Sequence, residues 1–226
     1  MLKKGLLPVF LIILSSVTHA QSKFEGFYGQ IGIGYEGISP TVSNSNVSIS
    51  DGTSLPIGIA TNNSNSFAGT ITAGYMKTLS DSFLIGIGAE FSPFKGRKTN
   101  FTGSLLGYDF GTGTYNKESS YNLFISPAAP IGQDGLIYGK FGYTGATINT
   151  TFASVSNSAN YSGYSLGLGY RQVIEGGLYS FIEGNYMHYG NKTISETGSI
   201  PGYTVSSSIT TRAVAYNFLI GIGYRF

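Results

Sequence analysis

The sequence predicts an all-β fold: an eight-stranded antiparallel transmembrane β-barrel with long extracellular loops and short periplasmic turns. Apolar side chains alternate with small or polar ones at period two, as in strands with two different faces. The alternating segments have the length of strands that cross a bilayer, and the connections between them alternate between long and short. Charged residues make up only 11% of the chain, against about 25% in soluble domains.

The first twenty residues have the three parts of a secretory signal peptide. Lys3 and Lys4 precede an apolar run over residues 6–14, and small residues follow up to Ala20. Because this run is too short to span a bilayer as a helix, we expect cleavage after Ala20 and one barrel domain over residues 21–226. A retained anchor helix is the weaker alternative.

The composition of the remaining chain narrows its class. Without Lys3 and Lys4 it carries 11 basic and 11 acidic residues, so no basic field indicates a nucleic-acid partner. The chain has no cysteine, which is compatible with an exported bacterial protein that does not rely on disulfides. No apolar run of spanning length follows residue 20, which excludes a helical membrane protein and leaves an exported soluble protein or a β-barrel.

Eight segments of 9 to 14 residues show the alternation. In the first, Phe27, Ile31 and Tyr35 share one face, while Tyr28 and Gln30 share the other. Strands of soluble proteins have about 5–6 residues, whereas tilted strands that span a membrane have about 9–11. The predicted strands cover residues 27–35, 67–75, 83–91, 121–129, 136–147, 161–173, 178–189 and 213–226.

The connections between these segments give an independent indication. Those after the second, fourth and sixth strands are short, and those after the first, third, fifth and seventh are long and polar. Outer-membrane barrels have this pattern, with both termini on the periplasmic side. We expect the long connections to be exposed loops, at residues 36–66, 95–120, 148–160 and 190–211.

Pro127 and Pro130 fall in the fourth segment, and because proline cannot donate to a ladder, we expect that strand to bulge or to end early. Ten strands remain an alternative if part of residues 101–110 pairs with another segment.

The few charges within the strands share the face opposite the apolar side chains, so they point inward. An eight-stranded barrel has an interior just wide enough for side chains to fill, and buried charges must pair. We therefore predict an interior polar network. Its members are Glu90, Lys140, Arg171 and Glu183, with Asn122, Asn185, Gln30 and Asn217 as neutral bridges. This network closes the lumen in one reading and forms a gate or ion path in the other, and the narrow interior favours closure.

Five stretches resemble the outer-membrane β-barrel proteins of the OmpA, OmpX and opacity type: FYGQIGIGY, LIYGKFGYTGA, YSLGLGYR, FIEGNYMHYGN and GIGYRF. The resemblance implies the outer membrane of a Gram-negative bacterium. It also implies a structural, adhesive or protective surface role, or a weak pore. The expected partners are outer-membrane lipid, lipopolysaccharide and the barrel assembly machinery, besides an unidentified surface ligand. No further periplasmic domain follows Phe226 in this sequence, so cell-wall tethering is not implied.

Three function classes follow, and a non-enzymatic barrel acting through its loops is the leading one. A pore is the second, because inward glycines such as Gly86 and Gly167 leave some space. A lipid A-modifying enzyme or a protease is the third, but a catalytic base needs a nucleophile beside it. His188 falls on the outer face near the rim, as an aromatic-belt residue does. No cofactor, metal or phosphate motif is present in usable form, so we expect none to bind.

The last strand ends in Tyr224 and Phe226. The resemblance implies that a terminal phenylalanine is the assembly signal read by the insertion machinery. We therefore predict that removing Phe226 reduces the amount of barrel assembled in the membrane more than it changes any property of barrel already folded. Quantitative blots of membrane fractions check this, and unchanged assembly would contradict it.

Overall fold

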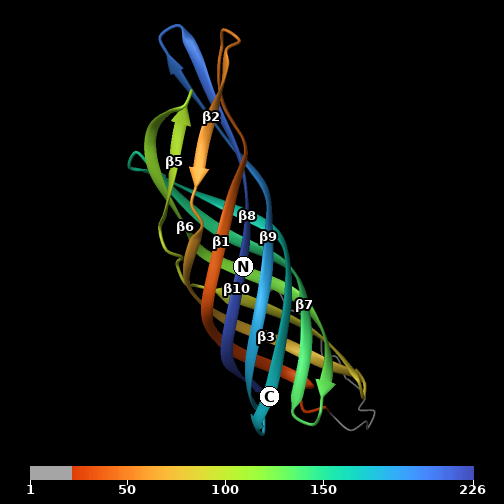
Figure 1. Cartoon of the computed structure of the whole chain (residues 1–226). Coiled ribbons are helices and arrows are strands. Elements are labelled where there is room, and N and C mark those ends of the chain that lie inside the picture. The colour runs from red at the N-terminus through yellow and green to blue at the C-terminus, as the bar shows by residue number, and fades with distance from the viewer. Residues whose placement is uncertain (1–21) are drawn as a thin grey trace, which may run out of the picture.

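Residues 22–226 are described by the computed structural model, and most of them lie in β-strands of a single antiparallel sheet. Eight strands close into a ring because the last pairs with the first (Figure 1). In ring order they are β1 (Gly26–Ile49), β3 (Ser64–Ser80), β4 (Phe83–Ser92), β6 (Tyr108–Ile131), β7 (Gly135–Phe152), β8 (Val155–Glu175), β9 (Leu178–Ile200) and β10 (Tyr203–Arg225). The predicted eight-stranded barrel is confirmed.

The predicted signal peptide and its cleavage site lie outside the described residues. Within residues 22–226, no helix is long and apolar enough to cross a membrane.

We call the end of the barrel with the three short turns the turn end, and the opposite end the hairpin end. The turns connect β3 to β4, β6 to β7 and β8 to β9. At the hairpin end the strands rise well beyond the ring, most of all in the blue β9–β10 hairpin and the orange β1–β2 hairpin (Figure 1).

The long connections are not loops, which corrects the prediction. β1 continues to Ile49, β9 runs to Ile200 and β10 starts at Tyr203, and β10 pairs with both of its neighbours over this extension. Ser, Thr and Asn fill both faces here, so the apolar alternation that indicates a strand is absent although the backbone ladder continues.

Two short strands belong to these extensions only. β2 (Ser54–Thr61) pairs with β1 and with β5 (Thr99–Leu105), and β5 pairs with β6. In the extensions, β2 and β5 therefore connect β1 to β6 by strand pairing. In the ring itself, β3 and β4 lie between the same two strands. The ten-strand alternative was therefore right about pairing near residues 101–110 but not about the ring, which has eight strands.

The two prolines of β6 neither shift the register nor end the strand, so that expectation was wrong. Register with β7 is the same at Ile125 and at Ala128, and the strand runs on to Ile131. Between these points the Oγ of Ser126 donates a hydrogen bond of 2.8 Å to the carbonyl of Gly139. A side chain thus supplies a link where proline has no N–H.

The outer face of the ring is apolar, with side chains such as Ile31 (60% exposed) and Phe218 (63% exposed) pointing away from the barrel. Aromatic pairs lie at both edges of this band. Those toward the hairpin end are Tyr35–Tyr216, Phe67–Phe94, Tyr121–Tyr143 and Tyr164–His188, and those toward the turn end are Phe27–Tyr75 and Tyr224–Phe226. An apolar band between aromatic girdles is the surface expected of a barrel in a bilayer.

The interior is filled in layers, which the inward side chains of β7 show in order. Leu136 and Tyr138 belong to an apolar cluster at the turn end, Lys140 follows among polar groups, and Ala146 belongs to a second apolar cluster toward the hairpin end. Phe24, just before β1, caps the first cluster with 5% of its surface exposed.

Ion pairs hold the segment around Phe24 across the turn end. Lys23 contacts Asp134 at 2.6 Å, and Glu25 contacts Lys77 at 2.7 Å. Burial opposes ionisation of Glu25, but the hydrogen bonds from Lys77 and Thr78 outweigh it and lower the pKa of this carboxyl.

Inward glycines make room for aromatic rings. A Cβ at any of these glycines would meet a ring that lies against the inner wall: Gly32 and Gly221 with Phe181, Gly74 with Tyr28, Gly88 with Phe124, Gly169 with Tyr138, and Gly223 with Tyr179. The space left by each missing side chain is therefore occupied by its neighbour.

We predict that Gly169→Ala lowers the free energy of unfolding by about 1–3 kcal/mol, because its methyl group displaces the buried Tyr138 ring. Gly198→Ala is the matched control: a methyl group at that position meets no other atom within 4 Å, so we expect a change within about 0.5 kcal/mol. Urea unfolding in lipid vesicles measures both, and equal effects would contradict the prediction.

Candidate functional site

Lys140 is the centre of the polar network inside the barrel. Its Nζ lies 2.9 Å from Glu90 Oε2 and 2.8 Å from Glu183 Oε1, and its side chain is 1% exposed. The ammonium also lies 4.4 Å from the centre of the Phe124 ring. One cation therefore joins carboxylates from β4 and β9, two strands on different sides of the ring.

Neutral side chains complete the coordination of both carboxylates. Glu183 accepts hydrogen bonds of 2.8 Å from the hydroxyl of Tyr138 and from Nδ2 of Asn185. Thr72 donates to Glu90 at 3.2 Å. Such partners are needed because a buried carboxylate with few hydrogen bonds is costly.

The remaining amides lie around this centre. Asn185 also donates to Asn217 Oδ1 at 2.8 Å, so Asn217 touches the network through one intermediate. Asn122 accepts from Ser165 Oγ at 2.7 Å and is the register partner of Glu90, while Gln30 accepts from the hydroxyl of Tyr179 at 3.1 Å. Of the four predicted bridges, only Asn185 contacts a charged group directly in the described hydrogen bonds.

Arg171 was expected to pair with the carboxylates, but it does not contact them. Its guanidinium lies against three tyrosine rings, 4.0 Å from the centre of Tyr28, 4.8 Å from Tyr138 and 5.1 Å from Tyr179. The side chain is 2% exposed and its Nε has no hydrogen-bond partner in the described structure. Cation–π attraction replaces the ion pair, and Tyr138 connects the two groups because it also donates to Glu183.

A second buried ion pair was missed. Lys117 and Glu36 approach to 2.6 Å, both about 3% exposed, and Lys117 also donates to Ser120 at 3.3 Å. Glu36 lies an even number of residues after Gln30, so it falls on the same inward face of the strand, and the sequence therefore indicated its position. Lys117 reaches the interior only because the register of β6 shifts between Lys117 and Ser119, and the sequence gives no sign of that shift.

The buried charged side chains of residues 22–226 balance in charge, with three acidic and three basic groups. Within residues 22–226, no group of three or more His, Cys, Asp or Glu side chains could hold a metal ion. His188 is half-buried on the outer face, where its ring stacks on Tyr164 at 5.1 Å.

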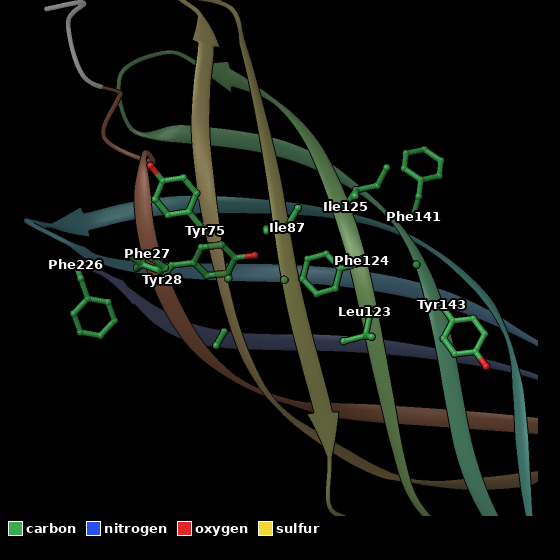
Figure 2. A pocket seen from close by; sticks show the side chains of 14 residues that line it. Phe27, Tyr28, Tyr75, Ile87, Leu123, Phe124, Ile125, Phe141, Tyr143 and Phe226 are labelled. Carbon is green, nitrogen blue, oxygen red and sulfur yellow. The ribbon is translucent and has the colours of Figure 1, made fainter. Parts of the chain in front are cut away.

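Two hollows of the described surface lie along the barrel wall and are mostly apolar. Figure 2 shows one of them, lined by outward side chains of β1, β3, β4, β6 and β7 together with Phe226; the buried rings of Tyr28 and Phe124 also line it. Tyr224 and Phe226, the predicted assembly signal, form a T-shaped pair at 5.3 Å and are well exposed.

We predict that Lys140→Met lowers the free energy of unfolding by about 3–5 kcal/mol, because Glu90 and Glu183 lose the cation between them. The triple variant with Glu90→Gln and Glu183→Gln added should be less destabilised, since no buried charge is then left unpaired. Lys23→Ala removes an exposed ion pair and should leave stability nearly unchanged. Urea unfolding in vesicles measures the free energy of unfolding of each variant. A similar decrease in the single and the triple variant would contradict the role of charge.

Comparison with known proteins agrees with this architecture. The family model described as outer membrane protein beta-barrel domain matches residues 6–226. Among solved structures, the outer membrane protein OprG of Pseudomonas aeruginosa has 15% sequence identity, a TM-score of 0.56, and alignment over 91% of this chain and 99% of its own. At this identity the likeness shows the fold.

Two further structures are similar at lower TM-scores. The attachment invasion locus protein Ail of Yersinia pestis, solved with the heparin analogue sucrose octasulfate, has 17% identity over 89% of this chain and 99% of its own, with a TM-score of 0.42. The outer membrane protease OmpT of Escherichia coli has 9% identity over 92% of this chain and 99% of its own, with a TM-score of 0.49.

A search of curated sequences gives no match. The family match over nearly the whole sequence, together with the closed ring, confirms the resemblance, and the chain belongs to the outer membrane protein beta-barrel domain family of bacterial outer-membrane proteins.

Proposed function

We propose that this protein is a non-enzymatic outer-membrane barrel with a closed lumen, and that it acts at the cell surface through its tall hairpins. The observation that carries this proposal is the filled interior. Three layers follow one another along the barrel axis: an apolar cluster capped by Phe24, the Lys140 network and a second apolar cluster. A structural or surface-interaction role, in adhesion or protection, uses the outside of such a barrel and not its lumen.

The hairpins support the second part of the proposal. They extend the sheet far beyond the apolar band, and their backbone is ordered by strand pairing along most of its length. A rigid surface holds its side chains in fixed positions, so less conformational entropy is lost when a partner binds.

The orientation of the barrel in the membrane follows from the difference between its turn end and its hairpin end. We place the turn end in the periplasm and the hairpin end outside the cell, as the barrels of this architecture are arranged. Outer-membrane lipid and lipopolysaccharide then contact the apolar band, and the assembly machinery contacts the exposed Tyr224 and Phe226.

A pore is the alternative that the inward glycines favour. In this barrel the space at Gly86 holds the end of the Met76 side chain and the space at Gly167 holds Asn185, while other inward glycines lie against rings such as Tyr138, which argues against a water path. The enzyme alternative has less support, since His188 stacks on an outer-face tyrosine, away from the interior polar groups.

We predict that the purified barrel gives no large, stable channels in planar bilayers, because buried side chains fill its interior. A porin reconstituted in the same way is the positive control. Large, stable conductance of the barrel would overturn the closed lumen, and loss of an activity on lipid A in His188→Ala would overturn the non-enzymatic assignment.

A further inference from the structure

The extension of β9 has one unpaired edge. β8 and β9 pair only as far as Gly163 and Tyr189, but β9 continues to Ile200 with β10 on its other side. All residues from Asn191 to Ile200 are exposed, and within residues 22–226 no strand covers this edge. A row of backbone N–H and C=O groups is therefore free to pair with another strand.

This edge carries two charged side chains, Lys192 and Glu196, but it lacks the other features that usually protect a free strand. The register with β10 shifts once, just before Lys192, and then has no shift from Lys192 to Ile200, a stretch that also contains no proline. The hairpin rises at the top of the molecule (Figure 1), where β10 pairs with β1 on one side and the edge of β9 has no strand on the other. Native proteins commonly shield such edges with prolines, bulges or several lysines, which indicates that this one is kept available for pairing.

The side chains along the edge are complementary to themselves. Lys192, Ile194 and Glu196 alternate along one face, with the two opposite charges equally spaced about the isoleucine. If two copies of this strand pair antiparallel about Ile194, each Lys192 lies opposite the Glu196 of the other copy. The two Ile194 side chains then lie side by side, and Ile209, the register partner of Ile194, extends this apolar row in each copy.

The other face is equally compatible with this register. Thr193 and Ser195 of one copy lie opposite Ser195 and Thr193 of the other. The same residue types already pair across β9 and β10, where Thr193 and Thr210 approach to 2.8 Å and Thr197 and Ser206 to 3.1 Å. Small hydroxyl side chains make such pairs without steric conflict.

We propose that the β9 edge is a self-recognition site, at which residues 191–197 pair antiparallel with the same residues of a second copy. This proposal rests on the proposed function, because it names the partner of the hairpins.

The direction of the strands decides where the second copy lies. Strands in such barrels tilt by about 35–45° from the membrane normal, so two β9 strands in one bilayer diverge by about 90° at most and cannot run antiparallel. The two copies must therefore stand in facing membranes, and the pair joins one cell surface to another.

Cysteine cross-linking tests the register. The chain has no cysteine, so Ile194→Cys can form a disulfide only between copies. Residues directly opposite each other in an antiparallel pair have Cα atoms about 4.5–5.5 Å apart, within disulfide reach. We expect Ile194→Cys to cross-link about tenfold more than the matched control Ser199→Cys, which does not face itself in this register. Cross-linking at residue 199 instead, or at neither residue, would overturn the proposal.

A charge exchange tests the pairing between membranes. Vesicles carrying the original chain should aggregate through their outward hairpins, whereas Lys192→Glu alone or Glu196→Lys alone should reduce aggregation about tenfold, because each places like charges opposite one another. Mixing the two variant vesicles should restore aggregation, since every charge again faces its opposite. No rescue on mixing, or cross-linking of residue 194 without vesicle aggregation, would overturn pairing between facing membranes.

The outcomes separate this inference from the proposed function. A barrel that conducts but still cross-links at residue 194 would overturn only the closed lumen. A barrel that does not conduct, does not cross-link at residue 194 and does not aggregate vesicles would overturn only self-recognition.

Discussion

Pairing of β1 with β10 closes the ring, and the rest of the structure depends on that closure. In hydrocarbon there is no water to satisfy a free strand edge, so the sheet must bond back to itself. Eight strands then fix the circumference, and the circumference fixes an interior that holds side chains and little else. The packing of the lumen, the pairing of its charges and the position of its glycines all follow from this limited width.

The interior shows how glycine and aromatic residues act together. Several inward glycines, such as Gly169 and Gly221, lie under a ring from a nearby strand, so the rings of Tyr138 and Phe181 fit flat against the wall. Tyr138 also donates to Glu183 and lies beneath Arg171, and it thereby links the ion-paired cluster to the cation–π cluster. The charges are thereby neutralised by neighbouring groups inside the barrel.

The described structure uses strand edges in two ways. Within the apolar band every edge is paired, as the absence of water requires. Beyond the band, water can satisfy backbone groups, so β8 and β9 can separate after Gly163 and Tyr189. The same backbone that must be closed in the membrane can therefore present a free edge above it.

The sequence by itself determined the eight ring strands, which side chains face outward, and the inward position of Glu90, Lys140 and Glu183, because a bilayer forces a strict period of two on every strand that crosses it. It could not reveal the height of the hairpins, since strands in water need no apolar face. Nor could it place Lys117, which depends on a register shift in β6, or set Arg171 among tyrosines instead of carboxylates. Those outcomes depend on which strands lie across the lumen from one another, and only the closed tertiary structure decides that.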